Sequence, residues 1–187
     1  MKKIILLAAT AFMITTGVNA QEVSFGAKAG ANFASLSGDL GEDIDGRTSF
    51  NVGVVANIGI SEKFSVQPEI VYSSQGGSSD VEGEDFTVKF DYINVPILAD
   101  FKVGQGLSLQ AGPQVGINIT SELDADGGSV DIDDTETIDL SLAFGAQYKL
   151  DQGIFFQARY GLGLSDIISD IDGKNNVISL SVGYFFN

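Results

Sequence analysis

The sequence contains no Cys, no His and no Trp. It therefore forms no disulfide, and it lacks the Cys and His ligands of common zinc sites and every catalytic triad or dyad built on imidazole. Positive charge is also scarce, because 10 Lys and Arg stand against 25 Asp and Glu, for a formal net charge of −15. This balance disfavours nucleic-acid binding, which needs basic patches to meet phosphates.

The first 20 residues predict a signal peptide for export. Lys2 and Lys3 precede an apolar stretch over 4–14, and small residues follow up to Ala20. This order is typical of a cleaved secretory signal. A membrane anchor is the alternative, but a helix needs about 20 apolar residues to span a bilayer. We predict cleavage after Ala20, followed by one domain over 21–187.

The rest of the chain alternates between apolar and polar residues, which predicts β-strands with two different faces. Between 23 and 33, every odd position is apolar. Eight such runs occur, at 23–33, 50–60, 64–72, 93–101, 107–119, 138–150, 154–164 and 178–186. We therefore predict eight antiparallel strands.

The fourth strand carries an irregularity. Apolar residues alternate from Phe86 onward, but the alternation changes phase between Asp91 and Ile93, which predicts a β-bulge there. Pro68 and Pro96 fall inside strand runs, where a missing N–H normally weakens pairing. We keep both strands in the prediction.

The composition of the polar faces indicates which side of the sheet points outward. No position on the apolar faces is charged, whereas ten positions on the polar faces are Gly. Glycine weakens a strand that faces water, but it makes room for side chains inside a small closed barrel. We therefore predict that the apolar faces meet lipid and the polar faces line the interior.

The connections agree with a transmembrane barrel. Three are short, and four are long, over about 34–49, 73–85, 120–137 and 165–177. Aromatic residues gather near the ends of the runs, as the girdles of such barrels do. The predicted fold is an all-β, eight-stranded antiparallel up-and-down transmembrane β-barrel in the outer membrane.

Six charged residues fall on the predicted interior face, namely Asp100 and five others that we expect to pair with one another. Lys28, Lys149 and Arg159 are positive, and Glu69 and Asp139 are negative. Buried charges need partners, so we predict that these residues form a polar network across the lumen. Eight strands enclose only enough space for their own side chains, so we expect a filled interior without an open pore.

The chain resembles the PorT-like outer-membrane β-barrel domain proteins of Gram-negative envelopes over nearly all of 21–187. The resemblance rests on the segments 25–33 (FGAKAGANF), 64–73 (FSVQPEIVYS), 92–98 (YINVPIL) and 112–116 (GPQVG). It implies an integral envelope protein. Some members of that family serve secretion or gliding machinery.

The last strand, with Tyr184 and Phe186 on its apolar face, resembles the C-terminal signal read by the barrel-assembly machinery. That signal usually ends on the aromatic residue, whereas Asn187 follows here. The resemblance implies the barrel-assembly machinery as a partner during biogenesis, outer-membrane lipid as the surroundings, and other envelope proteins as further partners.

The long connections are acidic, since they contain 18 of the 25 Asp and Glu residues. The segments 124–127 and 170–173, both with a D-x-D-G pattern, share part of a calcium-loop spacing. Neither has the full ligand pattern, so we predict no metal site and no cofactor. Solvated loops that resist aggregation are the simpler interpretation.

Catalysis is not expected. A Ser–Lys nucleophile with Lys28 or Lys149, or a pair of carboxylates, would be the available chemistry, but no such group has a fixed setting in the sequence. We expect a structural or interaction role in the cell envelope, associated with secretion or adhesion. The alternative is a transport or binding module, either a narrow pore or a soluble periplasmic barrel that carries an apolar ligand.

Overall fold

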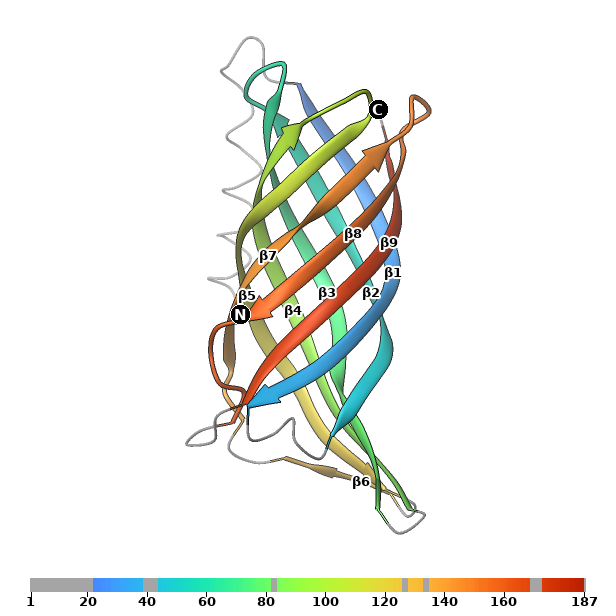
Figure 1. Cartoon of the computed structure of the whole chain (residues 1–187), viewed down its shortest axis with the longest axis vertical. Helices are drawn as coiled ribbons and strands as arrows, with labels where there is room; N and C mark the ends of the chain where they lie inside the picture. The colour runs from blue at the N-terminus through green and yellow to red at the C-terminus, as the bar shows by residue number, and fades with distance from the viewer. Residues whose placement is uncertain are drawn as a thin grey trace, which may run out of the picture.

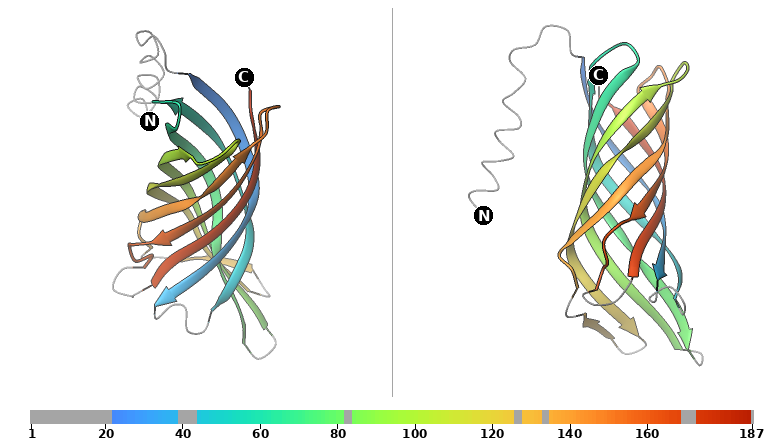
Figure 2. Two further views of the ribbon diagram at one scale, coloured as in Figure 1. Left: turned by 45° about the horizontal axis from the view of Figure 1, so that its top comes forward. Right: turned by 60° about the vertical axis from the view of Figure 1, so that its left-hand side comes forward.

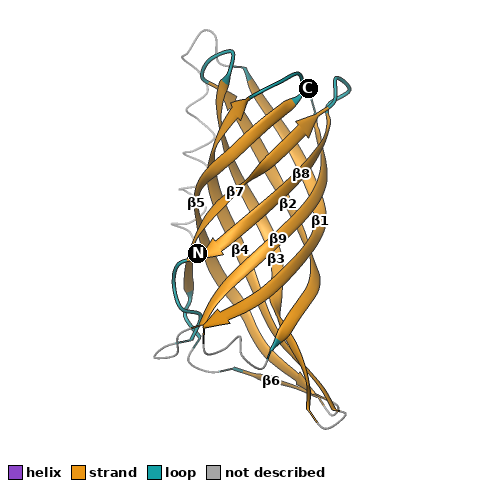
Figure 3. Ribbon diagram, viewed as in Figure 1, coloured by secondary structure: helices purple, strands orange, loops and turns teal. Residues whose placement is uncertain are grey.

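The computed structural model describes residues 22–38, 44–81, 84–125, 128–132, 135–168 and 173–186. The predicted signal peptide lies outside these ranges. The strands are β1 Val23–Gly38, β2 Asp45–Gly59, β3 Phe64–Val81, β4 Glu84–Lys102, β5 Leu107–Ala125, β6 Gly128–Asp131, β7 Ile138–Lys149, β8 Ile154–Gly163 and β9 Gly173–Phe185. Figure 3 shows these strands joined by turns and loops. Among the described residues, no helix is long and apolar enough to cross a membrane.

Eight strands close into a barrel. The antiparallel pairings run β1–β2–β3–β4–β5–β7–β8–β9, and β9 pairs back with β1. Strand β6 stands apart because it pairs only with the outer end of β5. Figures 1 and 2 show the tilted cylinder, with β6 beyond its lower end in Figure 1. The eight-stranded antiparallel barrel is confirmed, and four-residue β6 is an addition that the periodicity did not predict.

The apolar faces point away from the barrel interior, as predicted. Phe25, Val54 and Leu180 are about half exposed, whereas Asn32 and Glu69 on the polar faces are buried. Backbone groups cannot be left unpaired in hydrocarbon, and closing the sheet pairs every strand edge within the membrane. The outside of the cylinder is therefore suited to lipid. A soluble barrel holding an apolar ligand would need the opposite orientation.

Several segments expected as loops are strands in the structure. Strands β3 and β4 continue to Val81 and from Glu84, and β5 continues to Ala125. These extensions pair with each other, with Gly77 opposite Val88 and Val88 opposite Leu123. Backbone pairing and side-chain contacts such as the Lys89–Asp124 ion pair hold them, so they do not need the lipid-facing apolar row on which the prediction relied. The short turns at the other end are confirmed.

The predicted bulge is at the expected level of the barrel but on the neighbouring strand. The β4–β5 register shifts between Asp91 and Tyr92, and Ile119 of β5 is the extra residue. Strand β4 itself keeps its alternation, because Phe90 and Tyr92 are both buried. The apolar pattern changes phase in the sequence because the interior itself becomes apolar at this end. Pro68 and Pro96 lie within β3 and β4, as expected.

Aromatic rings stand on the outer surface near both ends of the barrel. At the long-loop end Phe50 and Tyr72 lie 5.6 Å apart between ring centres, and the Tyr72 hydroxyl donates to Asp91 Oδ2 at 2.7 Å. At the short-turn end Tyr184 and Phe186 lie 6.0 Å apart. Rings with polar tips at these levels are typical of membrane interfaces.

The outward orientation leads to a depth-dependent prediction. Val182→Arg places a charge halfway along the lipid-facing row of β9 and should destabilise the folded barrel by about 2–4 kcal/mol. Ile154→Arg, beside a short turn, should cost at most about 1 kcal/mol. Urea unfolding in lipid vesicles, followed by heat-modifiable gel mobility, measures both. Equal and negligible effects would contradict a lipid-facing surface.

Candidate functional site: the polar interior of the barrel

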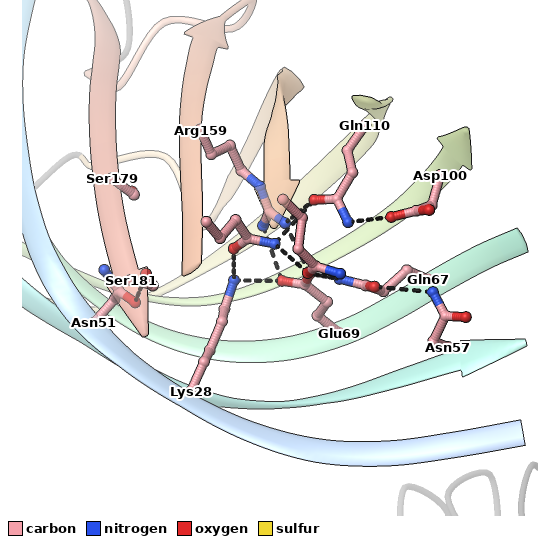
Figure 4. Close-up of polar contacts among 12 residues, drawn as sticks. Lys28, Asn51, Asn57, Gln67, Glu69, Asp100, Gln110, Arg159, Ser179 and Ser181 are labelled. Atoms are coloured by element: carbon pink, nitrogen blue, oxygen red, sulfur yellow. Dashed lines mark hydrogen bonds and ion pairs between the residues drawn. The ribbon is translucent and has the colours of Figure 1, made fainter. Parts of the chain in front are cut away.

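Three of the predicted interior charges meet near the middle of the barrel. Glu69 on β3 accepts from Lys28 Nζ on β1 at 2.7 Å. It also accepts from both terminal nitrogens of Arg159 on β8, at 2.8 Å and 2.7 Å. All three side chains are buried. We call these residues the ion cluster, and Figure 4 shows them converging from opposite walls of the barrel.

The carboxylate of Glu69 is fully hydrogen-bonded. Its Oε1 also accepts from Gln67 Nε2 at 2.9 Å, so its two oxygens receive four hydrogen bonds in total. A bidentate guanidinium–carboxylate pair is among the stronger polar contacts in proteins. Such a complete set of partners is what allows a charge to stay buried, because an unpaired one would carry the full desolvation cost.

Glutamines extend the ion cluster to a second carboxylate. Gln157 accepts from Lys28 at 2.8 Å and donates to Gln110 at 2.9 Å. Gln110 donates to Asp100 at 2.6 Å, and Asp100 also accepts from Ser108. The sequence analysis missed Asp100 and these glutamines as network members. Their inward positions on the strands were the available signal, but position alone does not show which inward groups touch.

Glycines on neighbouring strands make room for the long side chains. Lys28 lies opposite Gly53 on β2 and Gly183 on β9, and Arg159 lies opposite Gly145 on β7. A side chain at Gly145 would collide with the backbone of β8 at Ala158 and Arg159. The cations can therefore cross the lumen because their neighbours have no side chain.

The structure corrects the prediction for Asp139 and Lys149. Asp139 is buried beside Gly116, away from the ion cluster, and its Oδ2 has no hydrogen-bond partner. Lys149 Nζ lies 4.9 Å from the centre of the Phe185 ring, and none of the ion pairs among the described residues includes it. Both residues face inward as predicted, but they lie too far along their strands to reach the ion cluster.

Apolar side chains close the interior at both ends. At the short-turn end Val55, Phe155 and Phe185 form a buried cluster, with the two rings 4.7 Å apart. The Phe155 ring covers Gly183, where a Cβ would collide with it. We call these three residues the inner plug.

At the long-loop end Leu36, Phe90, Tyr92 and Ile167 form a second buried cluster, which we call the outer cap. The backbone holds Ile167 in place, since its carbonyl accepts from Glu136 at 2.8 Å and its N–H donates to Gly173 at 2.9 Å. The polar interior therefore lies between two apolar layers. A cavity of about 30 Å³ beside the ion cluster is far too small for an organic substrate.

Other predicted features remain predictions. Tyr184 and Phe186 lie on the outer face of the final strand segment, but nothing in the structure tests recognition by assembly machinery. Asp124 forms an ion pair with Lys89, while residues 126–127 and 170–172 of the calcium-like segments lie outside the described residues. Within the described ranges, no three acidic side chains gather around a point that would hold a metal ion.

Comparison with known proteins identifies the family. The model for the outer membrane protein beta-barrel domain matches residues 19–169, so the chain belongs to that family and is an outer-membrane protein. A search of curated proteins found no match.

Solved structures show the same fold at low sequence identity. Neisserial surface protein A has 19% identity and a TM-score of 0.65, with 88% of this chain and 99% of that chain covered. Ail of Yersinia pestis, in complex with the heparin analogue sucrose octasulfate, has 18% identity and a TM-score of 0.56, with the same coverage. These similarities concern the fold alone.

Removing the charge of Glu69 should test the ion cluster. Glu69→Gln leaves two buried cations without a carboxylate, so we expect a loss of about 3–5 kcal/mol in the free energy of unfolding. Lys149→Gln, which removes a cation outside the ion cluster, should cost at most about 2 kcal/mol. Urea titrations in detergent compare the two. Equal losses would contradict a central role for Glu69.

Proposed function

We propose that this outer-membrane barrel has a structural or interaction role in the cell envelope. The observation that carries the proposal is the filled interior, in which the inner plug and the outer cap lie at the two ends of a polar layer whose central charges, Lys28, Glu69 and Arg159, are paired. A lumen built in this way leaves the outer surface and the outer connections as the places where the protein meets other molecules.

The filled interior argues against transport as the main role. A narrow pore would need a continuous aqueous path, whereas the rings of Phe155 and Phe185 pack against each other at one end and Ile167 is buried at the other. The soluble periplasmic carrier is disfavoured by the outward apolar faces. Enzymatic activity is disfavoured because Glu69 and Asp100 are hydrogen-bonded to their own partners, and the cavity beside the ion cluster has no space for an organic substrate.

The acidic connections favour a cationic partner. The strand ends that they join lie opposite the short turns, and we infer that this end faces the outside of the cell. Ail was solved with a sulfated polyanion. The dense negative charge of this chain would repel such a ligand and attract basic surfaces on an envelope or host protein. The resemblance to PorT-like proteins supports partners within secretion or adhesion assemblies, and assembly through the barrel-assembly machinery.

Conductance measurements test the filled lumen. Wild-type protein in a planar bilayer should show no steady channel. Phe155→Ala with Phe185→Ala thins the inner plug and should make brief openings more frequent. Phe156→Ala, which removes a ring of the same size from the lipid-facing side of β8, should behave like wild type. A large, steady wild-type conductance would favour the transport alternative.

Binding measurements test the partner chemistry. Nanodiscs that carry the protein should bind immobilised polylysine but not heparin, and binding should weaken as salt screens the charges. Neutralising Asp131, Asp133 and Asp134 together should reduce the binding several-fold. Neutralising Glu62 and Asp151, in the short turns, removes acidic charge from the opposite end and serves as the control. Equal losses in the two variants would contradict a role for the acidic connections.

A further inference from the structure

A small cavity lies inside the barrel on the long-loop side of the ion cluster. Its volume is about 30 Å³, and the residues around it include Lys28, Ser73, Arg159 and Gly161. A buried water needs about 10–15 Å³ by this measure, so the space holds roughly two waters or one small ion. We call it the inner cavity.

Hydrogen-bond donors without acceptors line the inner cavity. Arg159 Nε is buried and has no partner, because the guanidinium directs its two terminal nitrogens to Glu69. Lys28 uses two of its three ammonium protons, on Glu69 and Gln157. Ser73 Oγ accepts from Asn32 and from Gln75, which leaves its hydroxyl proton free to donate.

The charges around the inner cavity have one sign. Lys28 and Arg159 line it, and no carboxylate does. Glu69 supplies one negative charge against these two positive ones. Asp100 is reached only through Gln110, and Figure 4 shows it on the opposite side of the ion cluster from Asn51 and Ser179. Asp139 lies beside Gly116, which pairs with the lining residue Asn94, but Asp139 itself does not line the inner cavity. A buried cation without full compensation is costly, so the inner cavity favours negative charge.

We propose that the inner cavity binds a small inorganic anion such as chloride. The anion accepts a charge-assisted hydrogen bond from Arg159 Nε, and Lys28 and Ser73 provide further donors. The volume suits a halide-sized ion. The anion is a structural ligand of the barrel, and it lies between the inner plug and the outer cap.

Bromide is the direct probe of this site, because its anomalous X-ray scattering distinguishes it from water. Wild-type protein refolded and crystallised in sodium bromide should show an anomalous peak in the inner cavity, in contact with Arg159 Nε. Crystals that show no such peak, with water density in its place, would overturn the proposal.

Gly161→Ala provides a matched control. A Cβ at Gly161 would meet only the carbonyl oxygen of Val177, at 3.8 Å, so the methyl group fits without strain and occupies part of the inner cavity. The variant should fold, lose the bromide peak and keep the contacts of the ion cluster.

Thermal unfolding gives a second readout. At equal ionic strength, wild type should unfold several degrees higher in sodium chloride than in sodium gluconate, and Gly161→Ala should lose most of that difference. The same salt difference in both proteins would mean that chloride acts elsewhere, which would also overturn the proposal.

Discussion

The need to pair every backbone group within hydrocarbon determines the rest of this structure. A sheet in a membrane must have no free edge, and the β1–β9 pairing removes the last one. Once the sheet is closed, side-chain alternation divides the residues between two environments, lipid outside and a narrow interior inside. The interior is then too small to hold bulk water and too polar to be packed with apolar groups alone. Paired charges, amides and glycines are the residues that such a space accommodates.

The ion cluster depends both on long charged side chains and on neighbouring glycines that have no side chain. Lys28 and Arg159 reach Glu69 because the positions beside them on neighbouring strands are glycines. The glycines lower the β-propensity of their strands, and the cations would be costly if they were unpaired. Together they fill the lumen with a small set of directional contacts. The apolar layers at both ends then keep water away from these contacts, which strengthens them because the local dielectric is low.

Much of the fold follows from the sequence, because alternation with a period of two reports directly on a sheet with lipid on one side. The apolar rows, the short turns and the closure were predictable for this reason. The pairing of the interior charges was harder to predict from the sequence. All five predicted residues face inward, yet only Lys28, Glu69 and Arg159 meet, since contact depends on height along tilted strands. Phe90 and Tyr92 led to the wrong prediction of a bulge in β4, because these apolar side chains face inward and form part of the outer cap. Some segments predicted as loops are strands in the structure, because backbone pairing continues there although no row of apolar residues faces lipid.

The extra residue Ile119 separates two parts of β5 that lie in different surroundings. Below it the strand belongs to the embedded cylinder, and beyond it the same strand pairs with β4 and β6 outside that cylinder. Hairpins of this kind can lengthen or shorten by two residues at a time. Each residue of the membrane-embedded strands then keeps its side chain on the same face of the sheet. The exterior of the protein is thereby free to diversify under selection, and the part within the bilayer need not be rebuilt each time.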